Sequence, residues 1–262
     1  MFLKVIACEI AFRELCHCAA RTRNLIDLEF LTQGHHDVPC QGRAEIQRRI
    51  DAVPAGKYEA IVIGYGLCGQ ILSGLTTAHT PLVAPRAHDC ITLFLGSKER
   101  YQELFAGNSG TYYFTSGWLE CRQRRGANLP AGNQMFMPAH SGAGLREAHE
   151  QWVQKYGVEK ARYLREVMGQ WTSYYNRGVL IDHDFTRPLN YREQVQKICE
   201  ERGWEYGEVP GDLGLFQRLL DGDWKESEVL TVRPGEQITP KFDEGIIEAL
   251  RVGGAAAAAE AK

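Results

Sequence analysis

The stretch AIVIGYGLCGQILSGL, residues 60–75, decides the fold of this chain. It begins with an apolar run of strand length, passes through a glycine-rich turn and continues with apolar residues at helical spacing. A strand that leads through a tight turn into a helix is the unit from which parallel sheets are built. Cys68 stands in the middle of that turn, where a phosphate-binding loop offers only backbone. The stretch therefore predicts either a nucleotide loop with an incidental thiol or a loop that presents the thiol.

Strand-like and helix-like segments alternate on both sides of this stretch. The patterns predict strands at residues 2–8, 27–36, 58–66, 81–90 and 110–120. They predict helices between these strands, at residues 10–20, 43–53, 70–78 and 91–105. The alternation resumes after residue 176. Such alternation predicts an α/β fold, a doubly wound and mainly parallel sheet with helices on both faces.

The predicted domain organisation follows from a change of composition and hydrophobic pattern in the middle of the chain. Residues 121–176 are rich in glycine at first and then amphipathic, which predicts a helical cap or insertion. The rest predicts a single α/β domain over residues 1–250, followed by an alanine-rich tail at 251–262.

Composition limits the partners that we expect. The formal net charge is -3, and acids and bases are interspersed, which argues against nucleic acid as a partner. No apolar run is long enough to span a membrane, and no secretory signal is recognisable. Eight cysteines without such a signal indicate a reducing compartment, so we expect a cytoplasmic protein whose thiols are free for chemistry.

Three cysteines each end a predicted strand and precede a predicted helix: Cys8, Cys68 and Cys90. Ligands of open α/β sheets bind outside the carboxyl ends of the strands, where the strand order reverses. With the order 2-1-3-4, strands one, three and four are neighbours, and the three thiols converge. Helix N-termini nearby are expected to favour the thiolate, the form that binds metals.

Three converging thiolates predict a metal site. Zinc accepts soft ligands in tetrahedral geometry, and three protein ligands leave a position for a small-molecule substrate. A [4Fe-4S] cluster held by three cysteines fits the same pattern. The sequence leaves the fourth ligand open among His35, His36, His88, Glu9 and the substrate itself. The competing interpretation is that these cysteines are small hydrophobic residues of the core.

Other residues carry weaker signals. Gly64, Gly66 and Gly69 have the spacing of a dinucleotide fingerprint, but we favour a hinge that lets Cys68 point at the cluster. Trp118 and Glu120 end the fifth predicted strand, where the Trp could wall a pocket and the Glu could act as an acid or base, as could His88. Cys16 and Cys18 face apart on a helix, which favours a structural role.

The linked motifs YGLCG (65–69), RAHDC (86–90) and GWLE (117–120) resemble a prokaryotic family known as domain of unknown function 1638. The likeness extends from Phe2 to about Gly235 and singles out Cys8, Cys68 and Cys90 with His88 and Asp89. Members of that family often look like companions of corrinoid-dependent methyl-transfer systems. The resemblance therefore implies a possible corrinoid or methyltransferase partner protein, although this chain has no corrinoid-binding D-x-H-x-x-G loop.

We expect a metal-dependent enzyme, a transferase or lyase, whose zinc activates a thiol or takes part in one-carbon transfer. In this hypothesis Gly66, Gly69 and Trp118 shape the binding site, and Glu120 or His88 moves protons. Two alternatives stay open. One is a three-cysteine [4Fe-4S] lyase or dehydratase resembling quinolinate synthase, and the other is a non-catalytic carrier of a metal or cofactor.

Overall fold

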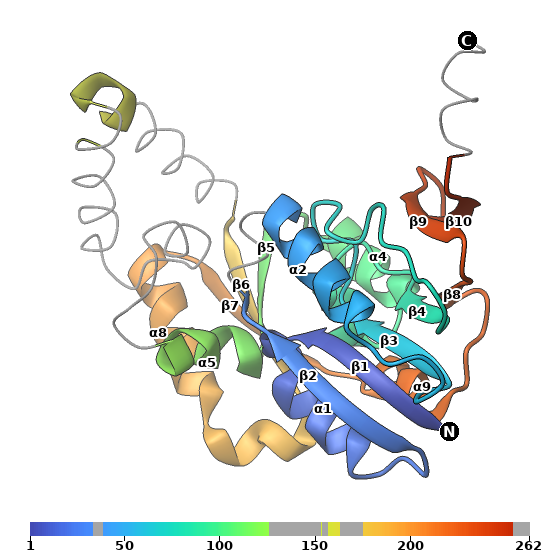
Figure 1. Cartoon of the computed structure of the whole chain (residues 1–262). Coiled ribbons are helices and arrows are strands. Elements are labelled where there is room, and N and C mark those ends of the chain that lie inside the picture. The colour runs from blue at the N-terminus through green and yellow to red at the C-terminus, as the bar shows by residue number, and fades with distance from the viewer. Residues whose placement is uncertain (34–38, 126–152, 154–156, 163–174, 254–262) are drawn as a thin grey trace. The chain divides into compact units, whose positions relative to one another are not determined.

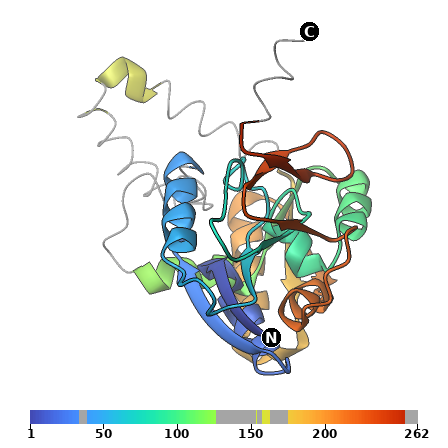
Figure 2. The same ribbon diagram turned by 45° about the vertical axis from the view of Figure 1, so that its right-hand side comes forward.

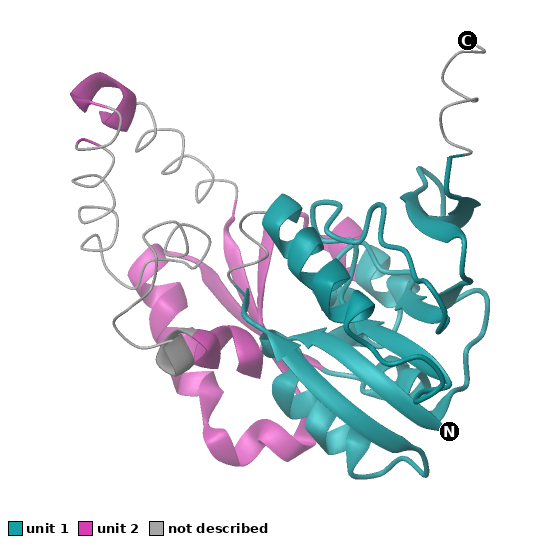
Figure 3. Cartoon of the chain, viewed as in Figure 1, with its two compact units in different colours: residues 1–103, 211–262 teal, residues 104–210 magenta. Residues whose placement is uncertain are grey.

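The computed structural model describes residues 1–33, 39–125, 153, 157–162 and 175–253. The chain divides into two compact units, which Figure 3 colours separately. Unit 1 consists of residues 1–103 and 211–262, and unit 2 of residues 104–210. The single domain expected over residues 1–250 stays a prediction. Most of the expected cap at 121–176 and of the tail at 251–262 lies outside the described residues.

Unit 1 contains a five-stranded sheet in the order β2-β1-β3-β4-β8 (Figure 1). The strands are β1 (Phe2–Cys8), β2 (Leu25–Leu31), β3 (Ala60–Gly64), β4 (Leu82–Pro85) and β8 (Val229–Val232). The first four pair in parallel, whereas β8 runs antiparallel to β4. The predicted α/β class is confirmed, and the order 2-1-3-4, on which the expected convergence of the thiols depended, is the order observed.

Burial along these strands follows their places in the sheet. Strand β3 lies between β1 and β4, and each of its five residues is buried. Strand β2 is at the edge, and most of its residues are partly exposed. A central parallel strand is covered on both faces, so its sequence is continuously apolar rather than alternating. This explains why residues 60–64 gave such a clear strand signal.

Helices cover both faces of this sheet. They are η1 (Glu9–Ala11), α1 (Phe12–Ala19), α2 (Pro39–Asp51), α3 (Cys90–Leu95), α4 (Lys98–Gly107, which crosses the boundary between the units) and α9 (Gly214–Asp221). Helices α1 and α9 pack against each other, and α2 lies on the opposite side of the sheet (Figures 1 and 2). Strands β9 (Glu236–Pro240) and β10 (Ile247–Arg251) form a separate antiparallel pair.

Two helix predictions in unit 1 were wrong. Residues 70–74 form turns, because Gln70 and Gly74 have positive φ angles of 71° and 80°, which a right-handed helix excludes. Thr76 then makes an isolated β-bridge with Gln237. The apolar residues that suggested a helix, Ile71, Leu72 and Leu75, are fully buried. Residues 91–105 form two helices, since Gly96 (φ 84°) ends α3 in the left-handed conformation.

Unit 2 contains a three-stranded parallel sheet in the order β5-β6-β7. Its elements are β5 (Thr111–Phe114), α5 (Ser116–Arg125), β6 (Arg177–Asp182), η5 (Asp184–Leu189), α8 (Tyr191–Arg202) and β7 (Glu205–Pro210). Helix α8 packs on β6 and β7. The core of the unit is a cluster of buried residues: Phe114, Leu119, Leu180, Val195, Ile198 and Cys199.

The fifth predicted strand is too long. Strand β5 ends at Phe114, and α5 begins two residues later. The Thr115 hydroxyl accepts a hydrogen bond from the Trp118 N–H (3.3 Å), as an N-cap residue does. Trp118 and Glu120 therefore lie on a helix and not at a strand end. Strands β5 and β6 also belong to a sheet separate from the one that carries Cys8.

Across the described part of the chain, none of the helices is both long and apolar enough to cross a lipid bilayer.

Candidate functional site

Three neighbouring strands of unit 1 each lead to a buried cysteine. Cys8 is the last residue of β1, Cys68 lies four residues beyond β3, and Cys90 begins α3 after β4. Their exposed fractions are only 6%, 5% and 7%. We call these three residues the thiol cluster. Because β3 lies between β1 and β4, its loop is the central one of the three.

The backbone packs these three strand ends tightly together. Gly64 pairs with Ala7 of β1, and a Cβ atom at Gly64 would lie 2.6 Å from the Ala7 Cβ. A Cβ atom at Gly66 would lie 2.5 Å from the carbonyl carbon of Asp89. The Cys68 N–H donates a hydrogen bond to the His88 carbonyl oxygen (2.8 Å). The glycines of the motif are thus required where one backbone approaches another.

Cys68 has an unusual backbone conformation. Its φ angle is 38°, and Gly69 and Gln70 follow with 65° and 71°. Non-glycine residues in this region cost on the order of 1–2 kcal/mol and occur mainly where the surrounding structure imposes them. The turn therefore keeps a cysteine where glycine would be less strained.

The thiols of Cys68 and Cys90 are in direct contact. A side-chain hydrogen bond between them, together with burial, raises the pKa of Cys90 well above its usual range. The charges of Cys68, Asp89 and Cys8 act in the same direction. The expectation that helix N-termini favour the thiolate is therefore wrong for Cys90. Cys8 is near enough to influence Cys90 electrostatically, so all three members of the cluster interact.

Within the described residues, no three histidine, cysteine or acidic side chains are arranged as a complete set of metal ligands. The donor chemistry nevertheless suits zinc, which prefers thiolates. The pair Cys68 and Cys90 is already in contact, and Cys8 belongs to the adjacent strand. Binding of one ion by all three thiols would require their sulfur atoms to turn toward a common point.

Two carboxylates and two phenols lie near the thiols. Asp89 accepts hydrogen bonds from the Ile91 N–H (3.0 Å) and from the Tyr101 hydroxyl (2.9 Å). Burial raises the pKa of the Asp89 carboxyl in spite of these bonds. Glu9 Oε1 accepts a hydrogen bond from the Gln33 N–H (2.7 Å). Tyr65 is buried beside the cluster. The sequence pattern did not single it out as a site residue, although it is the first residue of the motif YGLCG.

The predicted accessory residues of unit 1 are in different situations. His88 is exposed, and its carbonyl oxygen, rather than its ring, meets the loop of Cys68. Gly66 packs on Asp89, and Gly69 is the second of three left-handed residues, which agrees with a role in shaping the turn. His35 and His36 lie outside the described residues.

Trp118 and Glu120 belong to unit 2. Trp118 is buried on α5, and its carbonyl oxygen accepts a hydrogen bond from the thiol of Cys121 (3.3 Å). Glu120 accepts a hydrogen bond from the hydroxyl of Tyr191. Their expected roles as pocket wall and acid or base stay predictions. The Thr115 N-cap was the signal that could have placed them on a helix.

The remaining cysteines occupy varied positions. Cys18 is completely buried on α1, and burial raises its pKa to about 12, which suits the structural role expected for it. Cys16 is partly buried on the same helix. Cys121 and Cys199 are buried in unit 2, and Cys40 is exposed at the start of α2.

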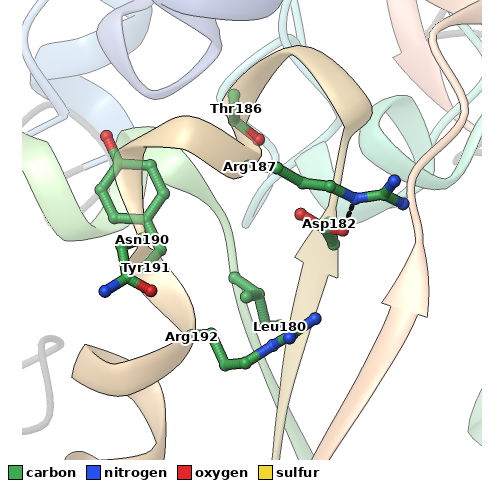
Figure 4. A pocket seen from close by; sticks show the side chains of 7 residues that line it. All are labelled: Leu180, Asp182, Thr186, Arg187, Asn190, Tyr191 and Arg192. Atoms are coloured by element: carbon green, nitrogen blue, oxygen red, sulfur yellow. Dashed lines mark hydrogen bonds and ion pairs between the residues drawn. The ribbon is translucent and has the colours of Figure 1, made fainter.

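Two pockets are lined by described residues other than the thiol cluster. The smaller, of about 120 Å³, is at the carboxyl end of β6 in unit 2, and Figure 4 shows its lining residues. There Arg187 donates a hydrogen bond to Asp182 (2.7 Å). The larger, of about 580 Å³, is a wide charged groove of unit 1 that includes Arg86 and Lys98. Neither is lined by a member of the cluster.

Comparison with protein families identifies the chain. The model of the family described as "Protein of unknown function (DUF1638)" matches residues 30–220, a range that includes Cys68 and Cys90 and begins after Cys8. Searches of curated proteins and of solved structures find no significant match. Because the family model covers well over half of the sequence, the chain belongs to the DUF1638 family.

Proposed function

We propose that this protein is a metal-dependent enzyme in which Cys8, Cys68 and Cys90 bind zinc and leave one position for a small substrate. The observation that carries the proposal is the direct contact of Cys68 and Cys90 at the ends of adjacent strands, with Cys8 on the strand beside them. Core packing alone does not require three buried thiols at the ends of adjacent strands, and perturbed pKa values are typical of functional sites.

The strained turn supports a chemical role for Cys68. A residue with a φ angle of 38° would be glycine if the turn served only to connect β3 with β4. A cysteine at such a position, nearly free of solvent contact, suggests that its sulfur is needed there. Bound zinc would supply Lewis acidity and lower the pKa of a substrate thiol or water.

The protein's own groups would prepare the site for this ligand. Asp89 is held by Tyr101 and by the start of α3, next to Cys90, so its carboxyl can orient a ligand or accept a proton. His88 is exposed and could exchange protons with solvent. One-carbon transfer with a corrinoid or methyltransferase partner protein is the proposed setting.

Metal analysis of protein purified without oxygen tests the proposal. We expect about one zinc per chain in the wild type, and a large loss of zinc in Cys68→Ser and in Cys90→Ser. Cys40→Ser is the matched control, because Cys40 is an exposed thiol of the same unit and should leave the metal content unchanged.

The same preparation separates the alternatives. A brown protein with sulfur-to-iron charge-transfer absorption would indicate that the three cysteines hold the [4Fe-4S] cluster of a lyase and not zinc. Zinc that exchanges rapidly with a chelator and passes to a partner would favour a carrier. Protein without metal, or a Cys68→Ser variant with the metal content of the wild type, would overturn the proposal.

A further inference from the structure

The hydroxyl of Tyr65 is a buried polar group that the fold leaves unsatisfied. Tyr65 is 4% exposed and stands between Gly64 and Gly66, directly after β3. Its hydroxyl oxygen has no hydrogen-bond partner among the described residues. Buried hydroxyls almost always have a partner, because the loss of hydration is otherwise uncompensated. An acceptor is therefore expected beside this group when the protein works.

The surroundings of the hydroxyl identify where that acceptor would lie. Burial first, and then the nearby charges of Cys8, Cys68, Glu9 and Glu45, raise the pKa of Tyr65 well above its ordinary value. The phenol thus keeps its proton at neutral pH and acts as a donor. Since two of these four neighbours, and the two with the largest influence, belong to the thiol cluster, the donor is available to a ligand bound there.

We propose that the Tyr65 hydroxyl donates a hydrogen bond to the ligand of the thiol cluster, and that this ligand carries an oxygen acceptor such as a carboxylate or hydroxyl oxygen. The inference rests on the proposed function and specifies its substrate class. A ligand that presents only N–H or alkyl groups at this place would leave the phenol unsatisfied, so the site discriminates against it. Tyr65 is a positioning residue for the ligand.

Thermal unfolding of the metal-free protein gives the first test. Tyr65→Phe should keep or raise the Tm, because it removes a hydroxyl that has no partner. Tyr58→Phe is the matched control, since the hydroxyl of the similarly buried Tyr58 donates to the carboxylate of Asp27. We expect a lower Tm for this control. A fall in Tm for Tyr65→Phe as large as that of Tyr58→Phe would show that the hydroxyl has a structural partner and would overturn the inference.

Ligand binding to the cobalt(II)-loaded protein gives the second test. Acetate offers an oxygen acceptor, whereas coordinated imidazole offers only an N–H donor. In Tyr65→Phe, we expect acetate to bind about tenfold more weakly, as measured by the visible spectrum of cobalt, and imidazole to bind as in the wild type. Tyr58→Phe should bind both probes as the wild type does.

The outcomes separate the inference from the function on which it rests. A wild type that binds no cobalt would overturn the proposed function, and the inference with it. Cobalt bound in both proteins with equal acetate affinity would overturn the inference alone. A folded Tyr65→Phe variant that loses cobalt would assign the hydroxyl to the metal itself, and this result also contradicts a role toward the ligand.

Discussion

Units 1 and 2 each contain parallel strands with functional groups at or just beyond their carboxyl ends, but these groups differ in kind. In unit 1 the strand ends carry the buried thiol cluster with Asp89 and Tyr65 beside it. In unit 2 they carry charged side chains in ion pairs near the surface, as Figure 4 shows for Asp182 and Arg187. The Arg187 side chain is 58% exposed.

The two sheets differ in how strongly the groups at their strand ends are perturbed. In unit 1, burial and close contact move the pKa values of Cys90 and Asp89 away from their ordinary values. Such shifts are typical of functional sites, because a low local dielectric magnifies each interaction. In unit 2 the ion pair of Arg187 with Asp182 has one partner that is 58% exposed, and water screens such a pair. Substitutions in the two units test this difference.

Substitution of Gly66 by Ala should have the largest effect. The new Cβ atom would lie 2.5 Å from the Asp89 carbonyl carbon, so the loops that carry Cys68 and Cys90 would have to separate. We expect a loss of about 2–3 kcal/mol in the free energy of unfolding, measured with denaturant. Gly107→Ala is the control, since no atom lies within 4 Å of the added methyl. Equal stability of Gly66→Ala and the wild type would contradict the close packing.

Substitution of Cys68 by Gly should remove the zinc and should cost the metal-free protein about 1 kcal/mol less stability than Cys68→Ala does. Both variants lose the buried thiol, but only glycine relieves the left-handed conformation at φ 38°. Gln70→Gly relieves a similar strain at φ 71° and should keep the zinc. Denaturant unfolding and metal analysis would measure both effects. A Cys68→Gly variant that is no more stable than Cys68→Ala would refute the strain assigned to this turn.

Substitution of Glu208 by Gln in unit 2 should have the smallest effect, and only above acidic pH. A hydrogen bond from Arg192, together with Tyr206, lowers the pKa of Glu208 from its ordinary value of 4.5. A lowered carboxyl pKa stabilises the fold above pH 4.5, and this contribution is lost as the pH falls through the folded value. Unfolding curves of variant and wild type should therefore differ slightly at pH 7 and converge in acid.

The control for Glu208→Gln is Glu205→Gln, whose carboxyl is 71% exposed on the same strand. We expect little change from this control at any pH. A difference between Glu208→Gln and the wild type that persists unchanged in acid would show that the stabilisation is not electrostatic.

Local signals in the sequence were sufficient where one segment decides its own structure. Ala60–Gly64 is a continuous apolar run, and Phe2–Cys8 is interrupted only by Lys4; such runs form strands that are covered on both sides. The alternation of strands and helices then predicted parallel pairing, and the order 2-1-3-4 was one of the arrangements that such pairing allows. The placement of Cys8, Cys68 and Cys90 at neighbouring strand ends was therefore within reach of the sequence.

Local signals failed where distant segments decide the conformation. The left-handed turn at Cys68 exists because the loop pairs with residues 87 and 88, twenty positions later in the chain. A second failure was local. The helix that carries Trp118 and Glu120 begins after the N-cap residue Thr115, but the aromatic residues before Thr115 favoured a longer strand.

By itself, the sequence determined the α/β class and the candidate thiols, because hydrophobic periodicity and chain connectivity depend on neighbours along the chain. Only the tertiary structure decided the strand order, the division of the described strands among three sheets, the contact of Cys68 with Cys90, and the burial of the Tyr65 hydroxyl without a partner among the described residues. These features depend on which surfaces meet in space, and burial then determines how strongly each polar group is perturbed.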